Sequence, residues 1–205
     1  MTHIERSETV LVMKVFISVL ILMFSLQSWT KANDIRDFEM EGISIGDSLS
    51  NHISKIQIDK LNKQFVYPNK QYYVFVIEKD YLNLNTYDYL QVEIKNNDSD
   101  YTVEALSGFL DYPNQIKDCH KKRKKIDNDI KENFKNLTIE KYNKKHRSDK
   151  TEKSINYITE FIFKNGDTIV TICEDWSSYM GHADSLRVGI VPKKFYDWIS
   201  KEAYN

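Results

Sequence analysis

The segment from Glu174 to Asp184 is the one stretch of this chain whose residue types could do chemistry. It holds three acids, two serines, a histidine and a Trp–Tyr pair. A Ser-His-Asp set could be drawn from it, but residues so close in sequence seldom form a triad, and no nucleophile elbow is present. Aromatic side chains on a loop favour recognition instead. We predict a binding loop that uses Trp176, Tyr179, Met180 and His182. An exported hydrolase that uses residues 174–184 is the alternative.

Trp176 also has a purely structural interpretation, because tryptophan is largely buried on average. In that case its ring would fold under a long helix as part of the core. Substitution by alanine separates the two interpretations, since a core tryptophan contributes several kcal/mol, about 3 or more, to stability.

The two cysteines, Cys119 and Cys173, are predicted to form a disulfide, as a cysteine pair in an exported protein usually does. In the chain-entropy model such a bridge stabilises by about 4 kcal/mol. The alternative is a zinc site, since zinc accepts the ligand types that gather near the cysteines. Those residues are Cys119, His120, Cys173, Glu174, Asp175 and His182. No two of them have the spacing of a known zinc motif, so we expect no metal ion.

Phosphate-binding and metalloprotease motifs are absent from the sequence, and we expect no cofactor. The basic run Lys121–Lys125 would wrap around a helix and has acidic neighbours, so we interpret it as a solvated surface. The overall net charge is −1, which gives no long-range attraction to nucleic acid. Tyr87, Tyr89, Tyr101 and Tyr112 could stack bases or sugars, but cross-strand aromatic pairs also simply stabilise sheets.

The N-terminal 32 residues are predicted to be a secretory signal peptide. Lys14 precedes an apolar run, residues 15–26, and small or polar residues follow up to Ala32, where we place the cleavage site. Met13 is the better translation start, because the twelve residues before it do not fit the pattern. The alternative is an uncleaved membrane anchor over residues 10–29, which Lys14 interrupts. After cleavage we expect no stable membrane span, and a location in the periplasm or outside the cell.

The remaining residues, 33–205, are predicted to form a single α+β domain. Its antiparallel sheet would consist of two three-stranded meanders with helices on one face. The predicted strands are residues 72–78, 87–95, 101–110, 155–163, 168–173 and 186–190. Asn165-Gly166 predicts a tight hairpin between the fourth and fifth strands. Apolar residues at helical spacing predict a long helix over residues 113–137 and a final one over 193–203. Leu49, Ile53 and Ile56 predict a short early helix, and residues 143–153 a charged, mobile connector.

Two segments carry resemblances to known proteins. The opening Asp37–Leu49, together with Cys173-Glu-Asp-Trp and the closing Phe195-Tyr-Asp-Trp-Ile, resembles small uncharacterised secreted proteins of AT-rich marine bacteria. More remotely, Ile45-Gly-Asp-Ser before a short helix pair is similar to outer-membrane assembly lipoproteins of the SmpA/OmlA type and to the beta-lactamase-inhibitor fold. The chain lacks the lipid-attachment cysteine of those lipoproteins. The combined expectation is an exported, non-enzymatic module that binds a protein or another envelope component.

Overall fold

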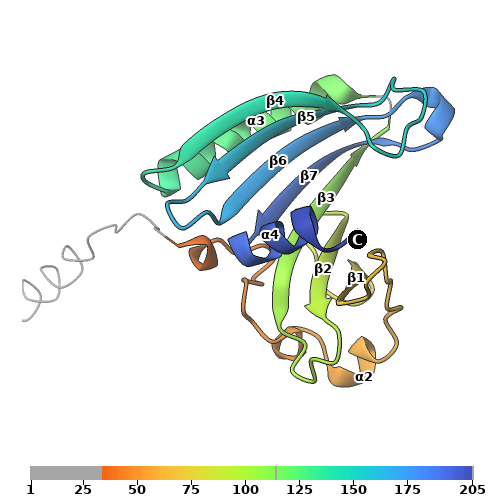
Figure 1. The fold of residues 1–205 in the computed structure, drawn as a ribbon, viewed down its shortest axis with the longest axis vertical. Coiled ribbons are helices and arrows are strands. Elements are labelled where there is room, and N and C mark those ends of the chain that lie inside the picture. Colours follow the sequence, from red (N-terminus) through yellow and green to blue (C-terminus); the bar gives the residue numbers. More distant parts are fainter. Residues whose placement is uncertain (1–33, 114, 205) are drawn as a thin grey trace, which may run out of the picture. The chain divides into compact units, whose positions relative to one another are not determined.

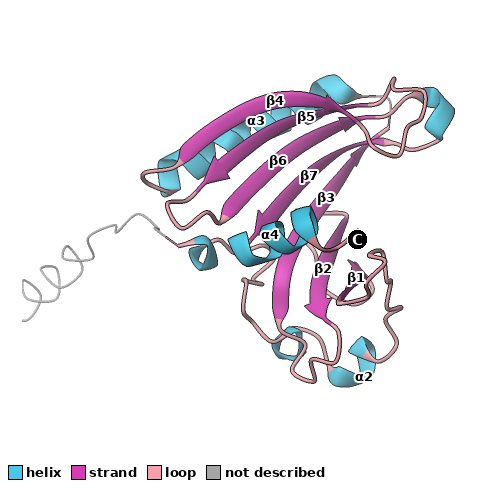
Figure 2. Cartoon of the chain, viewed as in Figure 1, coloured by secondary structure: helices cyan, strands magenta, loops and turns pink. Residues whose placement is uncertain are grey.

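The computed structural model describes residues 34–113 and 115–204, and these build one antiparallel sheet of seven strands. The strand order across the sheet is β1-β2-β3-β7-β6-β5-β4 (Figures 1 and 2). The strands are β1 Tyr72–Glu78, β2 Tyr89–Lys95, β3 Val103–Tyr112, β4 Thr138–Lys145, β5 Ile155–Ile162, β6 Thr168–Asp175 and β7 Asp184–Val191. The predicted α+β class is confirmed. The predicted leader, residues 1–32, lies outside the described residues.

The segment before β1 holds three short helical turns, η1 (Ile35–Asp37), η2 (Leu49–Asn51) and α2 (Lys55–Ile58). Ser54 begins α2 with a capping box, in which its hydroxyl and the Gln57 side chain satisfy each other's backbone N–H groups. This new helix start shifts the helical register, so Ile58 is buried whereas Ile56 is 72% exposed. The prediction that Ile56 continues the apolar face of Leu49 and Ile53 is therefore wrong.

The long helix α3 spans Ile116–Asn133 and is followed by β4, a strand that the sequence analysis did not predict. We expected the helix to continue to residue 137 and a mobile connector to cover residues 143–153. Phe134 instead leaves the helix with extended backbone, and the chain turns back to pair with β5 from Thr138. Every residue of β4 is exposed, so the strand has no alternation of buried and exposed positions.

The helices α3 and α4 (Lys193–Lys201) lie on opposite faces of the sheet (Figure 1). Tyr73 belongs to the core cluster that includes Cys119 of α3, whereas its neighbour Tyr72 packs against Trp198 of α4. Successive strand residues point to opposite faces. The prediction of helices on one face is therefore wrong, because the aromatic side chains at the start of β1 give the sheet a second, smaller core. We call these two sides the α3 face and the α4 face.

The Asn165-Gly166 hairpin is confirmed between β5 and β6, with a turn closed by the Gly166 amide and the Phe163 carbonyl. Only Gly166 has a positive φ, at +89°, which is the geometry of a three-residue loop with a bulge rather than of a two-residue turn. A side chain at this position would also meet Lys193 of α4, whose Cδ lies 2.7 Å from where a Cβ would stand.

Two buried links fix α3 to the sheet. The predicted disulfide is confirmed and joins Cys119 of α3 to Cys173 of β6, with both residues fully buried. Two turns further along the helix, the Asp127 carboxylate accepts hydrogen bonds from Thr159 of β5 at 3.1 Å and Thr171 of β6 at 2.6 Å. Arg123 lies between them and donates to the Tyr157 carbonyl. The guanidinium group of Arg123, within the basic run, thus has a backbone carbonyl as its hydrogen-bond acceptor.

Cys119→Ser is expected to lower the free energy of unfolding by about 2–4 kcal/mol, because the unfolded chain then regains the freedom of a 54-residue loop. Chemical denaturation of the wild type and the variant measures this difference. The native wild-type protein should show no thiol that reacts with an alkylating agent. Two reactive thiols in the native protein would contradict the bridge.

Candidate functional site

Two loops meet at one end of the sheet, residues 146–154 between β4 and β5 and residues 176–183 between β6 and β7. They lie at the same end because Lys145 pairs with Ile155, and Ile155 pairs in turn with Asp175. The second loop contains all four predicted contact residues. The first lies, apart from Ser154, within the segment that we expected to be a mobile connector, and we call the two together the loop pair.

Trp176 joins the two loops through its ring. The ring centroid lies 3.9 Å from that of His146 in the first loop and 4.7 Å from that of His182 in its own loop. The Trp176 backbone N–H donates to Asp184 at the start of β7, with a distance of 2.9 Å. Trp176 is half-buried and takes no part in the core under α3. It therefore organises a small aromatic layer in the loop pair, and the interpretation as a core residue is wrong.

Asp149 is the polar centre of the loop pair and is 3% exposed. Its carboxylate accepts five hydrogen bonds, from the backbone and hydroxyl groups of Thr151 and Ser154 and from the Ser177 hydroxyl. The Ser177 backbone N–H in turn donates to the Ser154 hydroxyl at 2.9 Å. This network joins the second loop to the first. The hydrogen bonds of Ser177 therefore hold its neighbour Trp176, and with it the aromatic layer, in place.

The network also sets the charge at this end of the sheet. Hydrogen bonds from Thr151 and then from Ser154 hold the pKa of Asp149 well below its usual range. Burial lowers the pKa of His146, and nearby His182 lowers it further while Glu174 opposes the shift. His146 accepts a hydrogen bond from the Ser148 backbone N–H on Nδ1, which suits the neutral ring. The loop pair thus combines a buried, hydrogen-bonded carboxylate with imidazole rings.

The second loop contains a short helical turn, η3, Ser178–Met180, whose first two residues are exposed. Tyr179 at its centre is 81% exposed, Met180 is half-buried, and His182 is exposed. Gly181 ends the turn with φ of +68°. Of the predicted contact residues, Trp176 and His182 touch each other and Tyr179 projects beyond them. His146, Asp149 and Ser154 were missed, although Asp149 and Thr151 have the spacing of a side-chain-stabilised turn.

The hydrolase alternative requires a serine hydroxyl that donates to a histidine ring. Ser177 instead donates to the Asp149 carboxylate, at 3.0 Å. No serine hydroxyl donates to an imidazole within residues 34–113 and 115–204. The zinc alternative loses two ligands because both cysteines are in the disulfide. The described residues contain no group of three or more His, Cys, Asp or Glu that could hold a metal ion.

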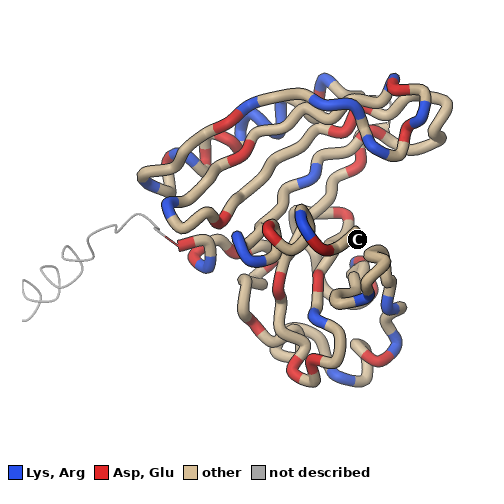
Figure 3. Tube along the Cα trace, in the orientation of Figure 1, with Lys and Arg blue, Asp and Glu red and all other residues tan. Residues whose placement is uncertain are grey.

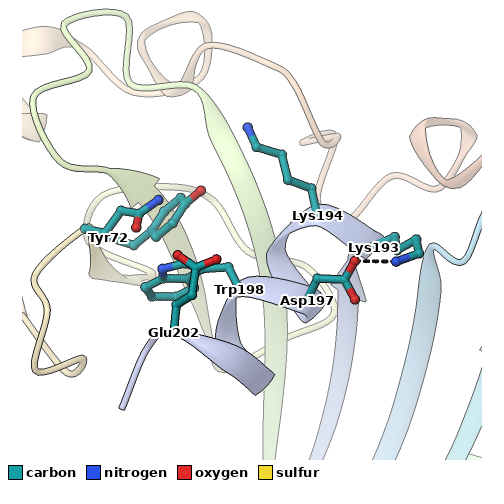
Figure 4. Close-up of a pocket in the computed structure, with 7 residues that line it drawn as sticks. Tyr72, Lys193, Lys194, Asp197, Trp198 and Glu202 are labelled. Carbon is teal, nitrogen blue, oxygen red and sulfur yellow. Dashed lines mark hydrogen bonds and ion pairs between the residues drawn. The ribbon is translucent and has the colours of Figure 1, made fainter. Parts of the chain in front are cut away.

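A cavity of about 460 Å³ lies elsewhere, between the start of β1 and α4 (Figure 4). Tyr72 and Trp198 line it but are 1% and 4% exposed, so they offer little surface to a ligand. Its charged side chains are two lysines and two acids, and Asp197 is already paired with Lys193. None of residues 174–184 takes part in this cavity. This cavity is therefore separate from the loop pair.

Glu93 of β2 is the most strongly perturbed carboxyl group on the α4 face. It is 5% exposed, and its Oε2 has no hydrogen-bond partner within the described part of the chain. Its cross-strand partners are Val74 and Ala105, both in the small core under α4. Burial raises the pKa of Glu93 to about 7, against the opposing charge of Arg187. Glu93 does not line the cavity beside α4, and the cost of ionising it bears on the stability of the fold.

Comparison of the chain with protein-family models, with curated proteins and with solved structures finds no match. The two resemblances drawn from the sequence therefore stay predictions. No helix in residues 34–113 or 115–204 has both the length and the apolar character needed to cross a membrane.

Asp149→Asn is expected to lower the melting temperature at neutral pH, because an amide cannot accept the five hydrogen bonds. The folded-state pKa of Asp149 is depressed, so its stabilisation is present above the unfolded value of about 4 and is lost as pH falls below it. The difference in melting temperature between wild type and variant should therefore shrink on acidification. A constant difference from pH 7 to pH 3 would contradict the assignment.

Glu93→Gln is expected to stabilise the protein at alkaline pH. The folded-state pKa is raised, so the cost of ionising Glu93 grows as pH rises from about 4.5 to about 7. At pH 8 the variant should be the more stable form by about 3 kcal/mol, and at pH 4.5 the two should be nearly equal. Denaturant titrations at the two pH values measure this, and an advantage that is equal at both would refute the buried charge.

Proposed function

We propose that this chain is an exported, non-enzymatic interaction module and that the loop pair is its contact surface. The partner is a protein or another component of the cell envelope. The observation that carries the proposal is Tyr179, which is 81% exposed on a loop whose base is held by a buried hydrogen-bond network.

An aromatic side chain in this position suits recognition for two physical reasons. Tyrosine buries a large area on binding and has few rotamers to freeze, so it is enriched among residues that dominate binding energy. The Asp149 network holds the base of the loop in place before any partner arrives, which lowers the ordering cost of association. His182 and Trp176, whose ring centroids lie 4.7 Å apart in the same loop, add to the aromatic surface.

The disulfide supports the location. Disulfides persist in oxidising compartments, so the Cys119–Cys173 bond indicates a non-reducing compartment. Together with the predicted leader, it favours the periplasm or the exterior of the cell. Anchoring by an uncleaved N-terminal helix stays the alternative for residues 1–32. Sequencing the N-terminus of the protein recovered from the envelope or the medium separates the two, since cleavage predicts a start near Asn33.

Tyr179→Ala and His182→Ala are each expected to abolish capture of the partner from the native envelope fraction in an affinity pull-down. Both side chains are exposed, so the melting temperature should stay nearly unchanged. Tyr196→Ala is the matched control, because Tyr196 is 51% exposed on α4, away from the loop pair. It should leave capture intact.

Trp176→Ala is the internal comparison for the same experiment. It removes the ring that His146 and His182 contact, so it should reduce both capture and stability. Capture that is unchanged in Tyr179→Ala and His182→Ala would remove the loop pair as the contact surface, whatever Trp176→Ala does.

A further inference from the structure

Among the residues that the structure describes, strand β4 forms one edge of the sheet and pairs with β5 alone. It is regular over its whole length, Thr138–Lys145, and all eight of its residues are exposed. Its outer side therefore presents a row of backbone N–H and C=O groups that have no strand beside them, which is a template for a further strand. The opposite edge differs, since Gln64 bridges to Val74 of β1 and covers part of it.

The side chains of β4 combine apolar and charged groups of both signs, and Figure 3 shows acidic and basic segments along the strand. Ile139 and Tyr142 are two of the large apolar side chains that the described residues expose, at 40% and 38%. The register with β5 places Glu140, Tyr142 and Lys144 on the α4 face. Ile139, Lys141, Asn143 and Lys145 lie on the α3 face.

A second copy of β4 can pair with the first only in certain registers. Directly opposite residues of an antiparallel pair have their side chains on the same face of the sheet. A twofold axis that relates two antiparallel strands stands perpendicular to the sheet, so one residue must lie opposite its own counterpart. The four central choices place that axis at Glu140, Lys141, Tyr142 or Asn143.

Charge selects one of these four registers, since like charges directly opposite each other are destabilising. An axis at Glu140 places Glu140 opposite Glu140 of the second copy, and an axis at Lys141 likewise places Lys141 opposite Lys141. An axis at Asn143 sets Lys141 against Lys145 twice. An axis at Tyr142 produces no like pair and sets Glu140 opposite Lys144 on both sides of a Tyr142–Tyr142 contact.

We propose that the β4 edge binds the β4 edge of a second copy of this chain, antiparallel and with Tyr142 opposite Tyr142. A separate observation within one copy supports this. Glu140 lies directly opposite Glu160 of β5, a like-charge pair, and the Tyr142 hydroxyl donates to Glu160 at 2.8 Å. Within the described residues neither Glu140 nor Lys144 forms an ion pair. In the dimer Lys144 of the second copy lies beside Glu140 and offsets that repulsion.

The arrangement joins the two sheets edge to edge and leaves the loop pair free in each copy. The loop pair follows the C-terminal end of β4, and the two β4 strands run in opposite directions. The two loop pairs therefore lie at opposite ends of the joined strands. The dimer does not depend on the binding role of the loop pair, and the dimer can fail while that role stands.

The test compares two single charge reversals with the double variant that restores the opposite charges. It uses the protein in the form that the producing cell releases, with any processing of the N-terminus left intact. Light scattering after size exclusion should show a dimer for the wild type. Glu140→Lys and Lys144→Glu each create two like-charge pairs and should weaken association about tenfold or more. The double variant Glu140→Lys/Lys144→Glu restores both pairs and should recover the dimer. Lys124→Glu, an equal charge change on the exposed side of α3, should have no effect.

Tyr142→Cys gives a second readout that depends on register. Direct cross-strand partners have Cβ atoms about 4.5–5.5 Å apart, so the two new cysteines should form an intermolecular disulfide on mild oxidation. Lys141→Cys, one position away on the other face, should crosslink far less. All these sites are exposed, and a single cooperative thermal transition in each variant will show that it folds. A wild type that is monomeric at its highest soluble concentration would overturn the proposal. So would a dimer that neither single reversal weakens.

Discussion

The attachment of α3 to the centre of the sheet is the constraint on which the rest of the fold depends. Strand β6 lies between β5 and β7 and contacts α3, and it supplies both Cys173 of the disulfide and Thr171 of the Asp127 cluster. Asp127 is a buried carboxylate, and its cost is offset because two strand hydroxyls donate to it. Helix and sheet are thereby locked in one register, and β6 leads directly into Trp176. This central contact therefore also sets the position of the loop that follows β6.

The sequence predicted the parts of the fold that are governed by local physics. The alternation in β5, the Asn165-Gly166 turn and the apolar stripe of α3 each reflect a periodicity or a backbone preference that a short window reveals. Strand β4 was missed because all eight of its positions are exposed, so its sequence shows no alternation of apolar and polar residues. The placement of α4 was wrong because Tyr72 and Tyr73 are both apolar enough to be buried. A short stretch of sequence does not indicate which face of the sheet a distant helix covers.

In the candidate site, too, some residues could be selected from a short stretch of sequence and others depend on distant contacts. Tyr179 and His182 were identifiable because exposed aromatic and imidazole groups stand out in a polar loop. His146 and Asp149 were not, since their partners Trp176 and Ser177 lie about thirty residues away in the sequence and the contacts exist only once β4 is in the sheet. Because strand β4 was not predicted, both His146 and Asp149 were missed. The strand brings the first loop to the second, and it also forms the edge of the sheet to which we propose that a second copy binds.

The central claim is that the loop pair is where a partner binds, and site-specific photocrosslinking tests it most directly. A photoreactive amino acid would replace Tyr179 in cells that produce this chain, and in a separate strain it would replace Tyr196 of α4, which is also exposed. Irradiation should give a discrete crosslinked product from position 179 and none of the same mass from position 196. A product from position 196 with none from 179 would contradict the account and move the contact surface to α4.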